Sequence, residues 1–448
     1  FQAITGPGDG PSAIDPATQI PVNEYTNPSG ALAGYPITNA FNADLSSYFY
    51  VPVNTNGLTT PSIVFDPPMT GTKFEVYVNV AIANNLYING QINSPGNVQN
   101  DWVDVSAQAN GSLTSLGFSS SATASDGFAG LKIDDKTVIE AGILPQAQQA
   151  FPNGLWWVKD MDNDNNHQLV DSVRGNNLAL NSNLTAAESA YDPPTGNSVA
   201  WCWNCPDTWA STDADITAGT IASNGARNLE SGFSIVSFQG NLTAGATVAH
   251  GLNAAPDFMA FKNRDLATGE WQCWSPSLGG NQWSLRFNSN AARADFNAWN
   301  NTAPNNNHVV LGPVTSTNGN GDDIIAYCWT AIPGYSAFGT YNGNGLDDGT
   351  FVYTGFKVAF LLTKAYTRGS TNWQIRDTTR SPTNPNPDTL YPDLFDKEYS
   401  GGNADVDFLS NGFKMRNGDT NVNGTQMLYI AFAENPFGGS NVSPVTAR

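Results

Sequence analysis

Carboxylates at alternate positions are able to bind a metal ion in the segment Asp160–Asn166, which reads Asp-Met-Asp-Asn-Asp-Asn-Asn. Calcium loops of the EF-hand type take oxygen ligands from alternate positions, turn at a glycine in position six and close with a glutamate in position twelve. Asp160, Asp162 and Asp164 fit the alternate positions, whereas position six is asparagine and position twelve is the shorter Asp171. Two hypotheses stay open: a calcium site at these three aspartates, and a solvated hairpin tip without metal. No other cofactor is expected.

Two Asp/Arg pairs share a spacing of three residues, Asp171 with Arg174 and Asp377 with Arg380. Each pair follows an apolar segment, where such residues usually form a structural ion pair or cap a turn. The alternative is that they make a polar contact with a ligand.

Aromatic side chains are the better ligand-binding material, since the chain contains 12 tryptophans. Most of them lie in apolar segments and are expected in the core. A tryptophan near a hairpin end, beside Asn and Asp, is able to stack on a sugar ring while its neighbours bond the hydroxyl groups. Trp271 and Trp373, together with Asp171 and Asp377, are therefore the candidate ligand-binding residues.

Cys202 and Cys205 form a CxxC motif, which is compatible with zinc, with a disulfide and with buried thiols. Zinc needs a second pair of ligands at suitable spacing, and the nearest candidates, His250 and Cys273, are single residues. Cys202 lies in Trp-Cys-Trp and Cys328 lies in Tyr-Cys-Trp, so both are expected on equivalent strands between aromatic residues. Buried, reduced thiols are the favoured interpretation.

Motifs for catalysis are scarce. The sequence contains no GxSxG elbow, HExxH helix, P-loop or dinucleotide fingerprint. His167 stands where Trp271 and Trp373 stand in similar segments, which predicts a packing role for it rather than that of a base. The carboxylates of a glycosidase meet only in three dimensions, so a polysaccharide-cleaving enzyme stays open as an alternative. We expect a protein without enzymatic activity.

A repeat of about a hundred residues must position these side chains. Its first segment, mostly apolar residues before a lysine, occurs three times with 103 and 102 residues between the lysines: Leu155–Lys159, Phe258–Lys262 and Phe360–Lys364. An apolar anchor segment follows 41, 64 and 65 residues after each lysine: Ala200–Trp203, Ala326–Trp329 and Tyr429–Phe432. The first copy is therefore the same unit shortened by 23 residues. We predict that the three lysines lie on hairpins at one structural position in tandem small domains.

Composition predicts an all-β protein. Of 448 residues, 40 % are hydrophobic but only 13 % are charged, and Asn, Gly, Ser and Thr supply the polarity. Asn and Gly tolerate the positive φ of tight turns, which suits many short strands. The net charge of −20 repels nucleic-acid backbones and anionic membranes, so no nucleic-acid partner is expected. No run of 18 apolar residues occurs, so no membrane insertion is expected either.

Residues 1–30 are rich in Pro, Gly and Asn and are expected to form an arm or linker. Residues 31–143 alternate apolar and polar side chains, as in Phe74–Val80, which predicts an N-terminal β-sandwich, jelly-roll-like, with a closing hairpin at Phe128–Val138. Three related β-sandwich-type units are expected to follow, at residues 144–230 (the shortened copy), 231–333 and 334–448.

The repeat motifs resemble those of tail-fibre and virion structural proteins of marine tailed phages, notably cyanophages. The resemblance covers roughly residues 30 to 437 and rests on these segments: Leu155–Lys159, His167–Gly175, Val199–Trp203, Ser231–Val236, His250–Leu252, Ala255–Phe258, Gly334–Ser336, Tyr341–Gly345, Asp407–Lys414 and Tyr429–Phe437. It implies a virion component with lectin-like β-sandwich modules.

Three functions are compatible with these observations. The first is a non-enzymatic tail fibre or receptor-binding adhesin, located on the virion outside the cell, that contacts a glycan of the host surface. The second is a knob or decoration protein attached to the capsid, and the third is a polysaccharide-cleaving tailspike. The expected partners are other virion proteins, a host surface glycan and further copies of the chain, as a trimer.

Overall fold

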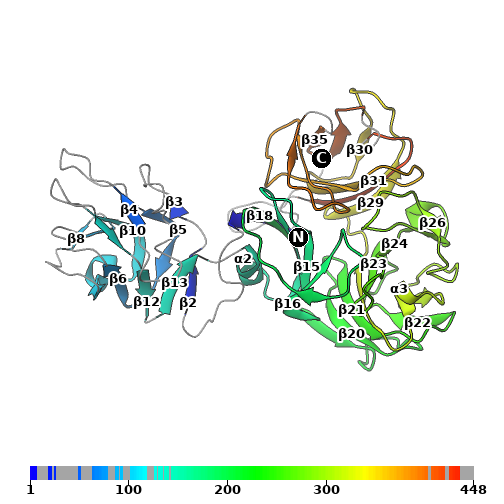
Figure 1. Cartoon of the computed structure of the whole chain (residues 1–448), viewed down its shortest axis with the longest axis horizontal. Coiled ribbons are helices and arrows are strands. Elements are labelled where there is room, and N and C mark those ends of the chain that lie inside the picture. The colour runs from blue at the N-terminus through cyan, green and yellow to red at the C-terminus, as the bar shows by residue number, and fades with distance from the viewer. Residues whose placement is uncertain are drawn as a thin grey trace. The chain divides into compact units, whose positions relative to one another are not determined.

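The computed structural model describes residues 1–7, 19–22, 25–26, 49–51, 63–78, 86–89, 91–93, 101–118, 126–128, 130–134, 136–140, 143–401, 405–418 and 423–433. The chain forms two compact units, one of Phe1–Asp9 with Ala147–Arg448 and the other of Gly10–Gln146. Nearly all regular elements are strands, so the predicted all-β class is confirmed (Figure 1).

The unit of residues 10–146 contains two five-stranded sheets, in the orders β3-β5-β10-β7-β8 and β2-β13-β12-β6-β9, and a short β4-β11 pair. Its predicted hairpin is confirmed, because Leu131 pairs with Val138 and Asp134 in the turn has a positive φ of 50°. Apolar side chains such as Val76 and Leu113 are buried and give this unit its own core. The elements from Gly10 to Ala150 are β2 (Gln19–Val22), β3 (Tyr25–Thr26), β4 (Phe49–Val51), β5 (Ile63–Thr70), β6 (Phe74–Val78), β7 (Leu86–Ile88), β8 (Gln91–Asn93), β9 (Asp101–Asp104), α1 (Ser106–Ala109), β10 (Ser112–Phe118), β11 (Asp126–Phe128), β12 (Gly130–Ile133), β13 (Lys136–Glu140) and α2 (Ile143–Ala150).

Three sheets build the unit that contains the repeats, and Figure 1 shows them grouped around one centre. Their orders are β1-β18-β14-β15-β16-β17, β19-β20-β21-β28-β23-β24 and β29-β37-β31-β32. The strands of these sheets are β1 (Gln2–Pro7), β14 (Gly154–Asp160), β15 (Gln168–Asp171), β16 (Gly175–Asn181), β17 (Ser189–Ala190), β18 (Asn197–Asn204), β19 (Asp207–Ala210), β20 (Ser223–Asn228), β21 (Phe233–Gln239), β23 (Phe258–Asn263), β24 (Gln272–Trp274), β28 (Asp323–Trp329), β29 (Ser336–Tyr341), β31 (Val358–Ala365), β32 (Gln374–Asp377) and β37 (Met427–Ala433).

All three sheets share one order of four strands: an opening strand, the anchor strand, the lysine strand and the second strand of the lysine hairpin. The register is also shared. The residue four positions before each lysine faces the last aromatic residue of the anchor, in the pairs Leu155–Trp203, Phe258–Trp329 and Phe360–Phe432. Lys159, Lys262 and Lys364 therefore hold one structural position, as the repeat predicts.

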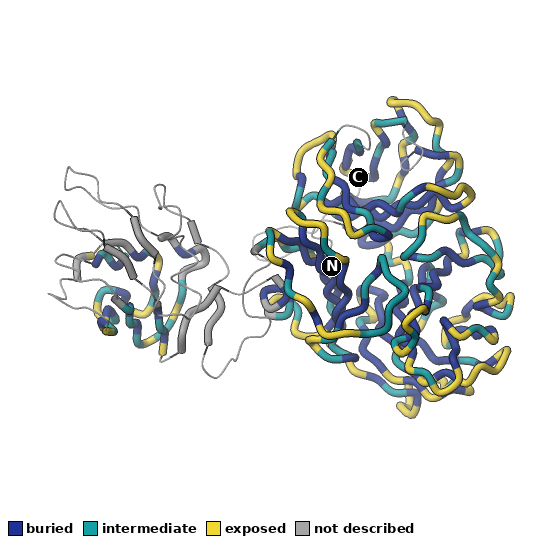
Figure 2. The backbone as a smooth tube through the Cα atoms, in the orientation of Figure 1, coloured by how far each residue is buried: buried dark blue, intermediate teal, exposed yellow. Residues whose placement is uncertain are grey.

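One shared core joins the three sheets. Alternate residues of each lysine and anchor strand point inward, so Trp203, Trp329 and Phe432 meet among other aromatic side chains. The space left between them is an apolar cavity of about 20 Å³. Such a cavity has room for about one water but no polar group to bond it, so the centre is close-packed. In Figure 2 the strands around this centre are buried and exposed residues gather in the outer loops.

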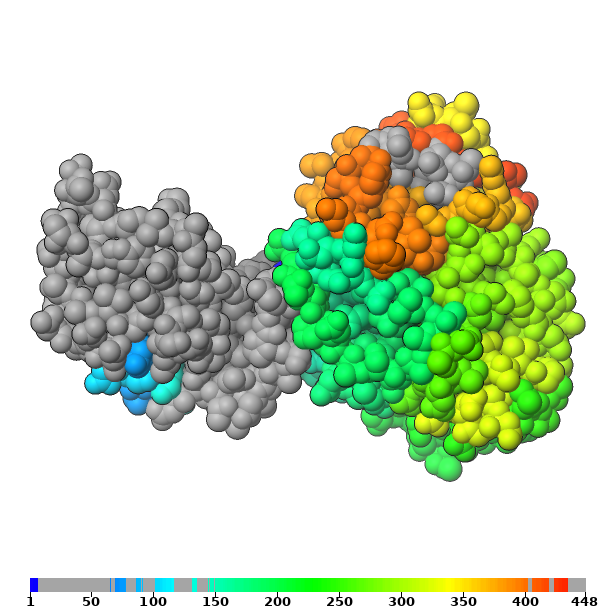
Figure 3. All heavy atoms as spheres, viewed as in Figure 1, coloured from blue at the N-terminus to red at the C-terminus, as the bar shows by residue number. Residues whose placement is uncertain are grey.

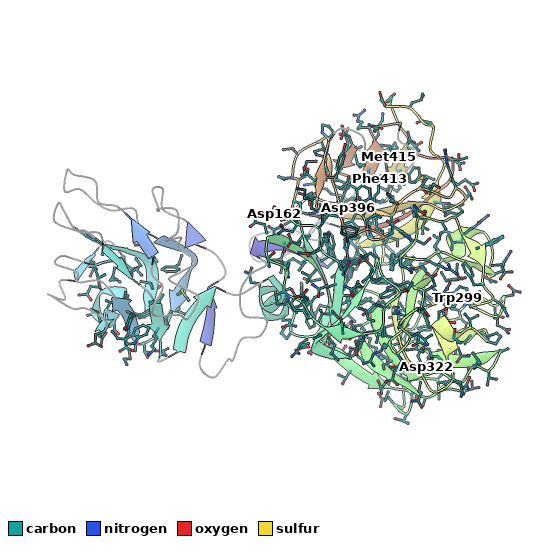
Figure 4. The ribbon with its side chains drawn as sticks, viewed as in Figure 1. Asp162, Trp299, Asp322, Asp396, Phe413 and Met415 are labelled. Atoms are coloured by element: carbon teal, nitrogen blue, oxygen red, sulfur yellow. The ribbon has the colours of Figure 1, made fainter. Side chains whose placement is uncertain are left out.

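The outer faces of the second and third sheets are covered by smaller sheets, β22-β27 and β30-β36-β35. Trp299 lies in the outer core of the second repeat, and Phe413 and Met415 lie in that of the third (Figure 4). Among its described residues the first repeat has neither small sheet. The 23 residues that it lacks correspond to the part of the chain that contains β27 in the second repeat, and β35 and β36 in the third. Near its outer face, Phe151 after helix α2 accepts a hydrogen bond from Nε1 of Trp156 at 3.1 Å. The remaining elements are β22 (Ala246–Ala249), η2 (Pro276–Leu278), β25 (Trp283–Ser284), β26 (Ala294–Asp295), β27 (His308–Leu311), α3 (Thr315–Asn318), β30 (Phe351–Tyr353), β33 (Asp388–Thr389), β34 (Tyr399–Ser400), β35 (Val406–Leu409) and β36 (Gly412–Met415).

Two predicted boundaries are wrong. The arm expected at residues 1–30 begins with strand β1, which pairs with β18 and takes the place that β21 and β29 hold in the other sheets. The unit of residues 10–146 is thus inserted in the chain between the opening strand and the lysine strand of the first repeat. The first repeat also ends earlier than residue 230, since β19 and β20 belong to the second sheet.

This insertion predicts that the three-sheet unit folds without residues 10–142. A variant in which a Gly/Ser linker of about 15 residues replaces them should keep its near-ultraviolet circular dichroism and melt cooperatively, because β1 still covers the edge of β18. The matched control lacks residues 1–9 as well and should lose stability or aggregate. Equal melting temperatures for both variants would contradict the assigned role of β1.

Candidate functional site

The three repeat lysines, which could supply amine chemistry, instead hold neighbouring repeats together. Each is fully buried, and each Nζ donates to a backbone carbonyl in another repeat. These bonds run from Lys159 to Phe395 at 3.1 Å, from Lys262 to Thr185 at 3.0 Å and from Lys364 to Asn290 at 3.2 Å. The first repeat thus bonds the third, the second bonds the first and the third bonds the second, which closes a circle.

Burial lowers the pKa of all three lysines to about 8. Carbonyl oxygens compensate for part of the lost hydration, and Lys364 also donates to the carbonyl of Thr371 at 2.6 Å. None of these three lysines forms an ion pair within 4.0 Å among the described residues, whereas Lys73 and Lys414 do. The three amines are enclosed and serve the interfaces between the sheets.

The Asp/Arg pairs are structural, as one of the two interpretations predicts. Asp171 bonds the backbone N–H groups of Val173 and Arg174 through Oδ1, at 2.9 Å each, and Nε of Arg174 through Oδ2 at 2.5 Å. Arg174 also pairs with Glu188 at 2.8 Å. Burial opposes the charge of Arg174, but Asp171 and Glu188 outweigh it and raise the pKa of the guanidinium.

The third repeat contains the same arrangement. Asp377 bonds the N–H groups of Thr379 and Arg380, and Nε of Arg380 lies 2.6 Å from Oδ2 of Asp377. Arg380 also pairs with Glu398. Asp171 and Asp377 have no exposed surface, so the hypothesis that they contact a ligand is not supported.

Each of these carboxylates also accepts a hydrogen bond from the anchor of another repeat. The hydroxyl of Tyr327 in the second repeat donates to Asp171 at 2.8 Å, and Nε1 of Trp201 in the first repeat donates to Asp377 at 3.0 Å. At the third interface both partners differ, since the donor position is Ile430 and the acceptor position is Ser275. The buried carboxylate, its arginine and its distant hydrogen-bond donor are therefore present together or absent together.

Trp271 and Trp373, the other candidate ligand contacts, have no exposed surface. Their Nε1 groups donate to backbone carbonyls of the preceding repeat, at 2.8 Å to Asn181 and at 2.8 Å to Arg286. Sequence reasoning placed these rings near hairpin ends, but the hairpin ends meet a neighbouring sheet rather than solvent. The two tryptophans are interface residues, and the ligand-binding assignment is corrected accordingly.

His167 occupies the same position in the first repeat. Its ring lies beside Trp157 and Trp201, and Nδ1 accepts a hydrogen bond from Nε1 of Trp157 at 3.0 Å. Complete burial lowers the pKa of His167 well below its usual value. The ring is therefore neutral and packed, as the repeat pattern predicts.

The predicted calcium loop uses its carboxylates internally. Asp160 is buried and accepts hydrogen bonds from the N–H groups of Asp162 and Gly196. Burial alone would raise the pKa of Asp160, but hydrogen bonds from Asn163, Gly196 and Asn165 outweigh burial and lower it. Asp162 at the exposed tip (Figure 4) bonds Asn197, and Asp164 accepts from the N–H of Lys397 in the third repeat. No group of three His, Cys, Asp or Glu side chains is arranged for a metal within the described ranges. This geometry gives the calcium hypothesis no support.

The prediction for the cysteines is confirmed, since Cys202, Cys205, Cys273 and Cys328 are buried free thiols. Cys202 and Cys328 hold equivalent places on β18 and β28. Burial raises the pKa of Cys202 to about 12, so this thiol is unreactive at neutral pH.

One carboxyl group in the third repeat has a pKa suited to acid chemistry. Burial raises the pKa of Asp393 to about 7, and Oδ1 accepts from the N–H of Trp373 at 2.9 Å. In the other repeats the same bond is made by amides, Asn183 to the N–H of His167 and Asn288 to the N–H of Trp271. Asp393 therefore stands at a structural position that the other two repeats fill with asparagine.

A polar pocket of about 180 Å³ lies on the first repeat. Its lining includes Asn165, Asn166, Gln168, Asn181 and Asp192. In Figure 3 the atoms of the third repeat (orange) lie against those of the first repeat (teal). The N–H of Lys397 in the third repeat donates to Asp164 of the first. Sequence reasoning missed the pocket, although the segment after Ser189 is where the first copy departs from the other two.

Comparison with known proteins finds a family but no function. Residues 189–436, more than half of the chain, match the model described as "Domain of unknown function (DUF7483)". No curated protein matches the chain. In the part that the structure describes, the helices are too short or too polar to cross a membrane.

The Asp171 network predicts a large effect of a single substitution. Asp171→Ala leaves the buried Arg174 with Glu188 as its remaining carboxylate partner and removes the acceptor of the Tyr327 hydroxyl. The free energy of unfolding should therefore fall by about 3–5 kcal/mol in chemical denaturation. The matched control is D171S/R174L, which copies Ser275 and Leu278 of the second repeat and removes both charges. It should lose clearly less than the single variant; an equal or larger loss would show that the ion pair is not the source of the effect.

Asp393 predicts a pH-dependent gain in stability. Its pKa is raised from 3.8 to about 7, so the folded state keeps a proton that the unfolded chain loses, and this contribution to stability falls as the pH rises from about 4 to 7. Asp393→Asn should therefore change stability little at pH 4.5 and increase it by a few kcal/mol at pH 8. The reverse change in the second repeat, Asn288→Asp, should destabilise at pH 8. A gain for D393N that is independent of pH would contradict the assignment.

Proposed function

The chain belongs to the DUF7483 family, whose function is unknown, and from this premise we propose that it is a non-enzymatic structural protein of a phage virion. Its role is that of a tail fibre or adhesin that contacts a glycan of the host surface. The proposal combines the resemblance of the repeat motifs with the geometry of the three-sheet unit.

The observation that carries the proposal is that the repeated polar side chains form hydrogen bonds between repeats. The three lysines, the two Asp/Arg pairs and Trp271 and Trp373 all bond a neighbouring repeat. Side chains that could do chemistry are thereby fixed inside a rigid scaffold. Such a scaffold supports a role in which loops and pockets are displayed and substrates are not turned over.

The tailspike alternative needs a pair of carboxyl groups across an open groove. Asp393 has the pKa of a general acid, but it is nine-tenths buried and replaces an amide that two other repeats use for the same backbone bond. This observation favours a structural role for Asp393. The capsid-decoration alternative differs from the adhesin only in its partner, and no observation on the chain favours it.

Location on the virion, outside the cell, and contact with other virion proteins are parts of the same proposal. The chain is also proposed to act as a homotrimer, because several copies on one particle multiply weak single contacts. Light scattering coupled to size-exclusion chromatography measures the number of chains directly.

The function is tested with the purified chain and envelope polysaccharide from cyanobacterial cells. We expect saturable binding without release of reducing ends, since the repeated polar side chains are buried between the repeats. D393N should behave like the unaltered chain in both measurements. Steady release of reducing ends that disappears in D393N would overturn the non-enzymatic proposal, and absence of binding would overturn the adhesin.

A further inference from the structure

We propose that the polar pocket of the first repeat binds one neutral, hydroxyl-rich sugar unit. This inference rests on the proposed adhesin function and assigns it a site. The pocket is the space of about 180 Å³ lined by Asn165, Asn166, Gln168, Asn181, Ser189 and Asp192.

The pocket exists because the first repeat lacks an outer sheet. In the other two repeats the chain continues beyond the second strand of the lysine hairpin into an outer sheet. It returns to the anchor strand through β27 in the second repeat and through β35 and β36 in the third. In the first repeat it turns back at once through Asp192, Pro193 and Pro194 to β18. Gln168 fixes this short path, since Nε2 donates to the carbonyl of Asp192 at 2.5 Å and Oε1 accepts from its N–H at 2.8 Å.

Three amides around the pocket are held by one end. Nδ2 of Asn165 donates to Asp160 at 3.0 Å, Nδ2 of Asn181 donates to the carbonyl of His167 at 2.9 Å, and Oδ1 of Asn166 accepts from Asn183 at 2.7 Å. The other end of each amide has no hydrogen-bond partner among the described residues. The remaining groups are two acceptors, Oδ1 of Asn165 and of Asn181, and one donor, Nδ2 of Asn166. Because the three side chains are already held in place, a ligand that bonds them loses little side-chain entropy.

Asp192 adds a carboxylate to these groups. Its backbone is locked by Gln168, whereas its side chain is exposed and no hydrogen bond to it is made within the described ranges. A carboxylate accepts two hydrogen bonds from adjacent hydroxyl groups, and amides accept or donate to further ones. Together these groups match the alternating donors and acceptors of a sugar ring.

Size and charge narrow the ligand class. A volume of about 180 Å³ lies below the roughly 300–1,000 Å³ of sites for drug-sized ligands, so one sugar unit fits better than a longer chain segment. The carboxylate of Asp192 and the net charge of −20 oppose acidic sugars. A neutral sugar is therefore favoured over a uronic or sialic acid.

The site should occur once per chain. The residue equivalent to Asn181 in the second repeat is Arg286, which pairs with Glu270 at 3.1 Å and lies over the ring of Phe296. Gln374, equivalent to Gln168, instead accepts from Arg376 at 2.6 Å in the third repeat. The hydrogen bonds that form the pocket are thus confined to the first repeat.

The test uses the full chain, a panel of glucose, galactose, mannose and glucuronic acid, and the cyanobacterial envelope polysaccharide. Ser189→Trp fills the pocket from an exposed position, and Asp192→Asn removes its charge while keeping its size. We expect one site per chain for a neutral sugar, at least tenfold weaker binding in S189W, and about tenfold weaker binding in D192N. Circular dichroism and the melting temperature check that both variants are folded.

The control is a pair of exposed aromatic residues on β30, Phe351 and Tyr353, which are 45 % and 63 % exposed and offer another surface for sugar stacking. F351A/Y353A should bind like the unaltered chain. Loss of binding in this control with retention in S189W would place the glycan at β30 and overturn the pocket, as would tighter binding of glucuronic acid. In both cases the adhesin function would stand; failure of the unaltered chain to bind polysaccharide or sugar would overturn both proposals.

Discussion

The three-sheet unit depends on buried polar groups that complete their hydrogen bonds only with a neighbouring repeat. An ammonium group such as Nζ of Lys262 is placed on the inner face of its sheet, where removal from water is strongly unfavourable without hydrogen bonds. The carbonyl of Thr185 in the neighbouring repeat supplies one of them. Because each lysine depends on a different neighbour, no sheet satisfies its own polar groups until all three have closed around the core. This requirement explains why modules that are separate in the sequence form a single compact unit.

The second repeat shows how these interactions are lost together. Ser275 replaces the aspartate and keeps the turn by accepting from the N–H of Ser277 at 3.2 Å, while Leu278 replaces the arginine and is buried. The distant donor is replaced by Ile430, so no hydroxyl or indole N–H is left without an acceptor. The glutamate position is Arg293, which lies over the ring of Tyr366 in the third repeat. A charged interface has become an apolar and cation–π interface without an isolated buried charge, as the penalty for such a charge requires.

Local patterns in the sequence predict what depends on local spacing. The all-β class, the hairpin around Asp134, the buried cysteines and the shared position of the lysines follow from alternation and repeat register. Strand β1 was not predictable in this way, because its partner residues on β18 lie 190 to 200 positions away and a whole unit is inserted between them. The candidate residues Trp271 and Asp171 were recognised as special, but a repeat pattern does not reveal which neighbour a side chain faces. Both residues face another repeat. The aromatic and charged side chains that suggested ligand contacts therefore form the interfaces between repeats.

A ligand site in such a protein is best sought where the repeats differ. Residues shared by all three copies, such as the lysines, are constrained by the closure of the sheets and have no freedom to adapt to a partner. The segment after Ser189 is not part of the closure of the sheets, because the first repeat is shortened there and its path is fixed by hydrogen bonds within the first repeat, such as those of Gln168 and Asp160. Variation in this segment changes the exposed groups without disturbing the shared core. One weak pocket per chain is also sufficient for attachment, since several chains on one particle act together and their binding is multiplied through a high effective concentration.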